Sequence, residues 1–474
     1  MTGRVRLSDY LDAPGDLLSR PPAELEAVGR REVELFQLEA ARRKLTRLAP
    51  RIPVLAGLLA GRDPSAFERV DDFIPVLFDE DVYKSYDAAW IDQGEFAKLT
   101  RWIAGLTTHD LSRVDMEDCR SLTEWCRRLD EQAGIFICHS SGTSGVLSFV
   151  PRSQRDRDLT VDHVVWYSHP LFRAQQRNDV TYFCMQARRQ YRITQPIYDG
   201  LEQRYQTHPV EALTDFLSPE FFIAQGRLRK AAQGGTLEAC LRNPLVAAHR
   251  HQVERYQRDL PELIRRWTEN LIENYRGRRI FFQGSFDKAW QITQHFRKAG
   301  VTAAFAPDSV FSLFGGIKDG SVLPDDWQDQ FRRVTGVDES RLVSGWGMSE
   351  ITGALLRCRQ GMYHFMIQTI PFLLEPGTRI PLPRTGVQTG QLALLEVISE
   401  DCWGGMISGD RGTIHWDRIC ACGRDGPLLD PGSIGRLYPP GSTDSEGVPR
   451  MPRSAESVPR TRAPNGHGSV SEDD

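Results

Sequence analysis

The sequence lacks a long apolar run, an excess of basic residues and an ordinary share of lysine. The longest apolar stretch, residues 52–61, is far shorter than the roughly 20 residues that a membrane-spanning helix needs. The N-terminus carries no apolar export segment, so we expect a cytoplasmic protein without a membrane partner. With 63 acidic and 59 basic residues, the net charge of −4 argues against nucleic acid as a partner.

Nine cysteines are spread through the 474 residues, an odd number. Without an export signal, free thiols or metal ligands are expected rather than a disulfide framework. The 40% of hydrophobic residues can form a large core, and the length allows roughly two to four domains. Wholesale disorder and a small disulfide scaffold are therefore excluded.

Strand-like and helix-like segments alternate between residues 279 and 353. This order predicts a largely parallel sheet with helices packed on it, and hence an α/β fold. The strand-like segments are residues 279–282, 301–307, 309–316 and 341–347, and the helical ones are 286–300 and 325–336.

Other patterns frame this region. Apolar residues at helical spacing predict a surface helix with a charged face over residues 21–48. The strand-like segments 134–138 and 146–151 enclose a loop. After Pro376, glycine, proline, threonine and valine predict a small β-rich subdomain. Residues 438–474 have few apolar side chains and are expected to be disordered.

The enclosed loop, residues 139–145 (HSSGTSG), combines glycines with hydroxyl side chains. Glycines let backbone N–H groups approach an anion, and hydroxyls add donors, which suits a polyphosphate. The segment is not a Walker A loop, because the terminal lysine and the following helix are missing. A simple Ser/Gly turn is the alternative interpretation.

Two shorter motifs follow. Residues 345–350 (GWGMSE) place an aromatic ring at the end of a strand, where it can stack on a base, and Glu350 can hold Mg²⁺ against phosphate oxygens. Residues 408–412 (SGDRG) put Asp410 in a tight turn, where it can accept hydrogen bonds from both ribose hydroxyls.

In this order and spacing, the three motifs resemble those of the adenylate-forming superfamily over roughly residues 80–436. The resemblance implies the large N-terminal domain of that superfamily, with stacked sheets flanked by helices, over residues 1–385. Residues 1–80 would form a helical N-terminal segment, residues 386–437 the β-rich subdomain, and residues 438–474 the tail.

Within the superfamily, two branches look most similar. Residues 314–318 (FGGIK) resemble the Gly-Gly-x-Lys segment of acyl-protein synthetases of the LuxE type. Residues 348–365 and 420–424 resemble the corresponding runs of phenylacetate-CoA ligases. The two branches differ in acyl acceptor, a protein thiol in one case and CoA in the other.

The resemblance implies a role for each matching residue in the attack of a carboxylate on the α-phosphorus of ATP. The glycine loop would cradle the β- and γ-phosphates, and the later motifs would bind adenine, ribose and Mg²⁺. The implied phosphate ligands are Ser140, Ser141, Gly142, Thr143, Ser144 and Gly145; the adenine and ribose contacts are Gly315, Gly316, Trp346, Gly347, Asp410 and Arg436; the catalytic group comprises Glu350 (the Mg²⁺ ligand), Ser349, Lys318 and His139. For His139, a turn histidine bonded to the backbone is the alternative.

Two departures from the family pattern stand out. The phosphate loop of many members ends in Pro-Lys, whereas Leu147 and Ser148 stand here, so Arg152 or Lys318 would have to supply the charge. Complete members also continue into a mobile lid domain with a catalytic lysine. Only seven lysines occur and none follows Lys318, so this lid is expected to be absent. Either a partner protein supplies it, or Lys318 or an arginine substitutes for its lysine, or the protein does not complete the usual two-step reaction.

Cys358, His364, Cys420 and Cys422 form a candidate set of metal ligands. Thiolate and imidazole ligands in a closed set of four suit structural Zn²⁺. Inert thiols and a hydrogen-bonded histidine are the alternative. A rival chemical use also exists, since acyl-protein synthetases carry the acyl group on a late cysteine, and Cys402, Cys420 and Cys422 lie late in this chain.

The sequence thus predicts an ATP- and Mg²⁺-dependent ligase that activates a carboxylic acid and passes it to a thiol, with a protein or carrier thiol favoured. One alternative is an acyl- or aryl-CoA ligase that works with a partner. The other is a catalytically incomplete subunit that binds nucleotide or acyl group as a scaffold.

Overall fold

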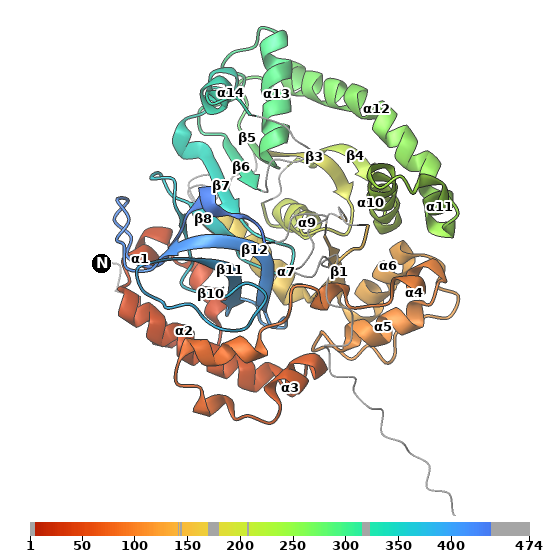
Figure 1. The fold of residues 1–474 in the computed structure, drawn as a ribbon. Helices are drawn as coiled ribbons and strands as arrows, with labels where there is room; N and C mark the ends of the chain where they lie inside the picture. The colour runs from red at the N-terminus through yellow and green to blue at the C-terminus, as the bar shows by residue number, and fades with distance from the viewer. Residues whose placement is uncertain are drawn as a thin grey trace, which may run out of the picture.

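The computed structural model describes residues 5–140, 142, 145–168, 180–205, 208–314 and 323–437. Its centre is one large sheet in which strands follow the order β10-β11-β12-β13-β9-β8-β7-β6-β5-β3-β4, with β14 paired to β12 (Figure 1). The strands of this sheet are β3 (Thr181–Arg189), β4 (Glu211–Phe216), β5 (Ile280–Gly284), β6 (Val310–Phe314), β7 (Leu342–Trp346), β8 (Leu355–Arg357), β9 (Tyr363–His364), β10 (Thr369–Leu374), β11 (Val387–Glu396), β12 (Gly405–His415), β13 (Leu428–Leu429) and β14 (Gly435–Arg436).

Strands β4, β3, β5, β6 and β7 are parallel, and helices cover both of their faces. Phe282 packs with α12 to α14 on one face, whereas its neighbour Phe281 packs with α7 and α9 on the other. Strands buried on both faces are typical of parallel sheets. The predicted α/β class, with helices flanking a large sheet, is confirmed. These helices are α7 (Gln154–Tyr167), α9 (Thr194–Tyr205), α12 (Pro244–Asn274), α13 (Phe286–Lys298) and α14 (Trp327–Thr335).

Two local predictions were wrong. Residues 301–307 form no strand; Ala304 N instead donates to Val334 O (2.9 Å), so this segment ties α13 to the end of α14. The predicted helix over residues 21–48 breaks at Gly29 into α1 (Pro22–Glu26) and α2 (Arg30–Leu48). Apolar spacing alone could not reveal these interruptions, because both segments still bury apolar side chains, among them Phe305 in one and Leu25 and Phe36 in the other.

The antiparallel strands β8 to β14 continue the sheet beyond β7 and lie beside the N-terminal helices (Figure 1). Gln37 Nε2 of α2 donates to Thr369 O (3.1 Å), and Lys44 Nζ donates to Glu396 O (2.8 Å). The expected boundary at residue 386 falls between β10 and β11, which pair with each other. The division into a large domain and a β-rich subdomain stays a prediction.

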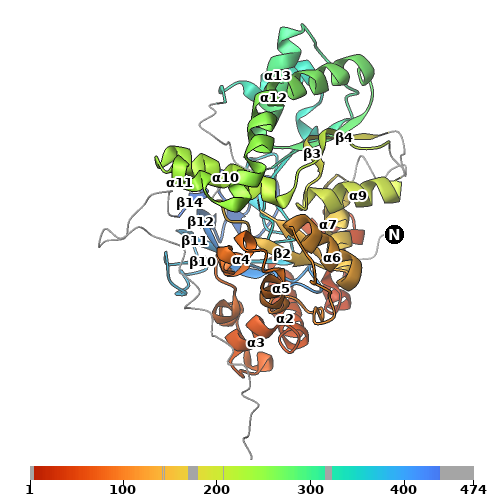
Figure 2. The ribbon, with the colours of Figure 1, turned by 90° about the vertical axis from the view of Figure 1, so that its right-hand side faces the viewer.

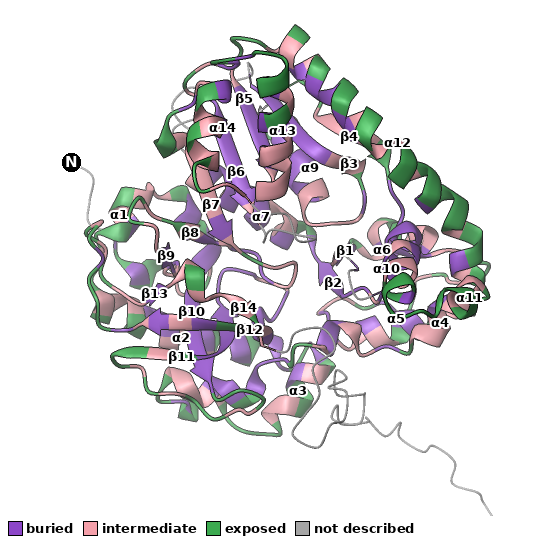
Figure 3. Ribbon diagram, turned by 45° about the horizontal axis from the view of Figure 1, so that its top comes forward, coloured by how far each residue is buried: buried purple, intermediate pink, exposed green. Residues whose placement is uncertain are grey.

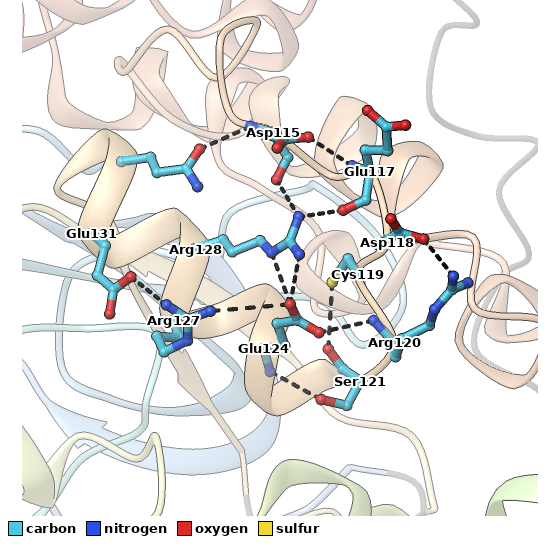
Figure 4. Close-up of polar contacts among 11 residues, drawn as sticks. Asp115, Glu117, Asp118, Cys119, Arg120, Ser121, Glu124, Arg127, Arg128 and Glu131 are labelled. Carbon is cyan, nitrogen blue, oxygen red and sulfur yellow. Dashed lines mark hydrogen bonds and ion pairs between the residues drawn. The ribbon is translucent and has the colours of Figure 1, made fainter.

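A separate hairpin of β1 (Phe136–His139) and β2 (Phe149–Arg152) carries the glycine loop. Helix α6 (Leu122–Ala133) leads into it, and a cluster of polar contacts fixes the start of that helix (Figure 4). Ser121 Oγ accepts from Glu124 N (3.1 Å), the Glu124 carboxylate accepts from Arg120 N (3.0 Å), and Arg128 binds the same carboxylate. The remaining helices are α3 (Pro53–Leu59), α4 (Ala88–Asp92), α5 (Phe96–Ala104), α10 (Pro219–Gln233) and α11 (Leu237–Leu241).

Helix α10 lies alongside α11, and α4 and α5 lie near the β1–β2 hairpin (Figure 2). Purple strands at the centre of Figure 3 contrast with the green outer turns of α12. Within the described ranges, no helix combines the length and the apolar character that crossing a bilayer requires.

Candidate functional site

Hydrogen bonds between Ser140 and Ser148 close the base of the glycine loop, where it joins the β1–β2 hairpin. Ser140 N donates to Ser148 O (3.2 Å), and Ser148 N donates to Ser140 Oγ (3.0 Å). The hydroxyl oxygen of Ser140 is therefore an acceptor in the contact that closes the loop. The other hydroxyl-bearing candidates, Ser141, Thr143 and Ser144, lie outside the described residues.

The loop packs against helix α10 at a point where only glycine fits. Gly142 and Gly145 have φ angles of 66° and 77°, in the region that glycine favours. Gly145 N donates to Gly142 O (2.9 Å), which closes a tight turn. A Cβ added to Gly226 of α10 would lie 2.1 Å from Gly142 O. The glycines of the motif thus serve close packing as well as backbone freedom.

His139 lies at the end of β1 and is fully buried, at 0% exposure. Its Nδ1 is 2.7 Å from Ser140 O, and its ring stands 5.1 Å from that of Phe222. Burial lowers the pKa of His139 to about 4, so the imidazole is neutral at pH 7. In this arrangement the ring of His139 contacts the backbone at the start of the loop. The predicted catalytic role of His139 stays a prediction.

Two arginines that the sequence analysis did not single out lie beside the loop. Arg192 Cζ is 5.9 Å from the ring centre of Phe222, whose carbonyl borders Gly142. Burial lowers the pKa of Arg192, and among the described residues its guanidinium has no hydrogen bond or ion pair. Arg227 is different, because it binds Asp92 (2.7 Å). Nothing in the local sequence around Arg192 marks it as a loop neighbour.

The GWGMSE motif begins inside the sheet and ends in an irregular segment after β7. A Cβ on Gly345 would lie 2.6 Å from Leu355 O, so glycine is needed where β7 meets β8. Trp346 is half-buried and pairs with Leu355. Ser349 and Glu350 follow in the irregular segment and are partly exposed, and Glu350 has no polar partner among the described residues.

Asp410 was predicted to occupy a tight turn, and this is wrong: it lies within β12. The pairing of β12 with β11 slips between Ile407↔Ala393 and Arg411↔Gln391, so Asp410 sits in a β-bulge. A bulge re-aims a side chain while the strand continues. Glycine and serine in the motif suggested a turn, but the long-range partner strand decided otherwise.

The carboxylate of Asp410 meets charges from three other segments. Arg436 of β14 lies opposite it in the sheet, with Nη1 3.3 Å from Asp410 Oδ1. Burial raises the pKa of Asp410, and the charge of Glu350 raises it further. Glu80, which the sequence analysis missed, approaches Gly409, where an added Cβ would be 2.6 Å from Glu80 Oε2. Acidic side chains therefore gather at this end of β12.

Replacing Asp410 by asparagine is expected to raise the melting temperature at pH 7 by about 1–3 °C. The folded-state pKa is raised, so the carboxyl group destabilises the fold once it is ionised. The gain should be present above this raised pKa and disappear as the pH falls below the unfolded value of about 3.9. Calorimetry at several pH values tests this, with Asp215→Asn, a replacement of an exposed acid, as the control. A lower melting temperature would mean that the Arg436 pair outweighs burial.

The structure brings Cys358, His364, Cys420 and Cys422 together. Their ligand atoms all lie within 4.8 Å of one another, with Cys358 Sγ 3.8 Å from Cys420 Sγ and Cys422 Sγ 3.4 Å from His364 Nε2. Two tight turns present the thiols, since Gly361 N donates to Cys358 O (2.8 Å) and Gly423 N to Cys420 O (2.8 Å). Three thiols and one imidazole in this arrangement suit Zn²⁺.

Cys402 is poorly placed for the rival role of acyl carrier. It is buried at 5% exposure, its Sγ donates to Pro151 O (2.9 Å), and burial raises its pKa well above the ordinary value. A thiol kept protonated and away from solvent is a weak nucleophile.

The predicted adenine-site and catalytic residues Gly315, Gly316 and Lys318 lie outside the described residues. Arg152, proposed as a charge for the phosphates, is buried among other partners.

No protein-family model and no curated protein sequence matches the chain. Among solved structures, it is similar to an open conformation of 2-hydroxyisobutyryl-CoA ligase in complex with 2-HIB-AMP and CoA, with a TM-score of 0.50 and 12% identity over 87% of this chain and 72% of that one. The same ligase in its thioesterification state gives a TM-score of 0.51 and 14% identity over 88% and 72%. The described chain therefore shares the fold of this ligase.

Proposed function

We propose that this protein activates a carboxylic acid with ATP and Mg²⁺, forming an acyl-adenylate and pyrophosphate. The observation that carries the proposal is the approach of motif segments that lie far apart in the sequence. Arg152, on the hairpin that bears the glycine loop, is bonded to the segment that contains Glu350, and the charge of Glu350 acts on Asp410. The fold that the chain shares with adenylate-forming CoA ligases supports the same activity.

The residues present suit ATP and its magnesium ion. Mg²⁺ prefers oxygen ligands, and Glu350 offers a carboxylate that has no polar partner within the described ranges. Asp410 could accept hydrogen bonds from ribose hydroxyls, which would offset the burial of its charge. Arg192 would supply a cation beside the glycine loop, where the family lysine is missing.

In the proposed reaction, one carboxylate oxygen of the acid attacks the α-phosphorus of ATP. The bond from this phosphorus to the bridging oxygen breaks, and pyrophosphate leaves with the electron pair. Bound Mg²⁺ supplies neutralisation of phosphate charge. The protein would contribute mainly by positioning ATP. The glycine loop and Arg192 would hold its phosphates, Glu350 would bind the Mg²⁺ ion, and Asp410 would hold the ribose.

We extend the proposal to transfer of the acyl group from the adenylate to a thiol. The sulfur, which gives up its proton, bonds to the acyl carbon, the bond from that carbon to the phosphate oxygen breaks, and AMP leaves. The complexes of 2-hydroxyisobutyryl-CoA ligase with both 2-HIB-AMP and CoA support thioester formation on this fold. The resemblance of residues 314–318 to acyl-protein synthetases favours a carrier or partner-protein thiol. Adding CoA or a carrier protein with a phosphopantetheine thiol to the preformed adenylate separates the two acceptors.

Hydroxylamine-trapped pyrophosphate release tests the first half-reaction without knowledge of the natural acceptor. A panel of aryl, fatty and amino acids is supplied with ATP, with and without Mg²⁺. Turnover that needs both an acid and Mg²⁺ supports the proposal. Failure with every acid, combined with thermal stabilisation by MgATP, would identify a nucleotide-binding protein without turnover instead.

Arg192→Gln is expected to raise the KM for ATP by about 10-fold, with little change in the KM for the acid. A guanidinium–phosphate contact is a charge-assisted bond, which contributes roughly twice a neutral hydrogen bond. Steady-state kinetics measures the split, and Arg189→Gln, an exposed arginine three residues earlier, is the control. An unchanged KM for ATP would remove Arg192 from the phosphate site.

We further propose that the Cys358, His364, Cys420 and Cys422 cluster holds one structural Zn²⁺. The set is closed, with four protein ligands, which is typical of structural rather than catalytic zinc. Its position supports this role, because Cys358 and His364 belong to the β8–β9 hairpin and Cys420 and Cys422 precede β13. The metal would hold these short strands together.

A further inference from the structure

The segment that carries Glu350 has no regular secondary structure, yet three buried side chains bind its backbone. Residues 347–354 lie between β7 and β8. Arg152 and Glu396 are 0% and 1% exposed, and His163 is 3% exposed. They come from β2, β11 and α7, elements that are far apart in the sequence.

Each of these side chains reaches a different backbone position. Arg152 Nη2 donates to Ser349 O (2.8 Å), and Nη1 donates to Thr352 Oγ1 (2.7 Å). The Glu396 carboxylate accepts from Thr352 N (2.7 Å) and Gly353 N (3.1 Å). On the following residue, Ala354 N donates to His163 Nε2 (3.0 Å). The bound positions enclose Glu350 on both sides.

We infer that Arg152, Glu396 and His163 are positioning residues, which together hold Glu350 at the site where ATP-bound Mg²⁺ is coordinated. This inference rests on the proposed function and deepens it. Arg152 lies on the hairpin of the glycine loop, and Glu396 lies on β11, the partner of the strand with Asp410. The three side chains therefore tie the position of Glu350 to both other parts of the nucleotide site.

The charged side chains that bind the segment lose their hydration on burial, which costs free energy that their polar contacts must offset. Lys44 stands behind Glu396 and donates to Glu396 O (2.8 Å) and Ser399 Oγ (2.7 Å) rather than to the segment. The carboxylate oxygens of Glu396 accept instead from two N–H groups of the segment. An apolar core would leave these N–H groups unpaired.

Thr352→Val and Glu396→Gln test the inference at two strengths. Valine keeps the shape of Thr352 and removes only the acceptor for Arg152, so folding should persist even where Glu396→Gln fails. Thr293→Val is the matched control, because Thr293 is also buried and its hydroxyl donates to Ala289 O within α13. Two measurements are made on each variant, hydrogen exchange of the 347–354 peptide and the Mg²⁺ dependence of pyrophosphate release.

Thr352→Val should exchange faster in this peptide and need about 3- to 10-fold more Mg²⁺ for half-maximal turnover, and Glu396→Gln should need more still. The KM for the acid and both readouts of Thr293→Val should stay unchanged. Faster exchange with an unchanged Mg²⁺ requirement would overturn the inference, because the contacts would then be structural only. If the wild type lacks turnover, the MgATP concentration that gives half-maximal thermal stabilisation replaces the kinetic readout. Variants equal to the wild type in that titration would equally overturn the inference, separately from the failure of the proposed function.

Discussion

Replacing Glu350 by glutamine is expected to lower hydroxylamine-trapped pyrophosphate release by at least ~10²-fold, while the fold stays intact. Glutamine keeps the size of the side chain and removes the charge that would bind Mg²⁺. Glu350 is partly exposed and has no polar partner among the described residues, so its replacement breaks no internal contact. The loss should appear in kcat and be partly relieved by higher Mg²⁺ concentrations.

Two further observations make this result specific. The melting temperature of Glu350→Gln should equal or slightly exceed that of the wild type, because the charge of Glu350 raises the pKa of Asp410 and removing it relieves repulsion. Glu375→Gln, an exposed glutamate just after β10, should leave turnover unchanged. Full activity in Glu350→Gln would remove the magnesium role of Glu350.

Removal of the proposed zinc should have the largest effect on stability. Strands β8, β9 and β13 contain only two or three residues each, which is too short for a hairpin to be stable alone. Cys358→Ser removes one of the four proposed ligands and should weaken zinc binding. We expect this variant to melt at least about 5 °C below the wild type, because the free energy of binding at a structural zinc site contributes to the free energy of folding. Elemental analysis should find one zinc per wild-type chain and less in the variant.

Cys240→Ser is the control, because Cys240 is half-buried and lies outside the cluster. It should keep both the metal and the melting temperature. A strong chelator should lower the melting temperature of the wild type to about that of Cys358→Ser, and it should not lower that of the variant further. Wild-type protein that folds fully in metal-free medium, at the same melting temperature, would contradict the zinc proposal.

The effect of zinc loss should extend to the nucleotide site through the sheet. Trp346 pairs with Leu355 of β8, and β13 pairs with β12, the strand of Asp410. The metal cluster therefore lies where the strands from the two later motifs are joined. Turnover of Cys358→Ser measured below its melting temperature should fall along with the stability, whereas Cys240→Ser should match the wild type.

Local patterns were sufficient for the elements of the parallel sheet. Alternating buried strands and amphipathic helices predicted β5, α13, β6, α14 and β7, because each of these carries its own pattern of apolar residues in the local sequence. The same reasoning failed at residues 301–307 and at Asp410. In both places the partner strand or helix, rather than the local residue types, sets the backbone conformation.

The sequence by itself determined the α/β class and the residue types that pointed to a nucleotide site and a metal site. It did so because glycines, hydroxyls, carboxylates and thiols have chemistry that is visible without coordinates. Only the tertiary structure decided which side chains surround the motifs, such as Arg192 at the glycine loop and Arg152, Glu396 and His163 around the segment of Glu350. These residues are single positions on distant elements, with no periodicity or spacing to mark them, and their roles arise from bonds that only the folded chain can form.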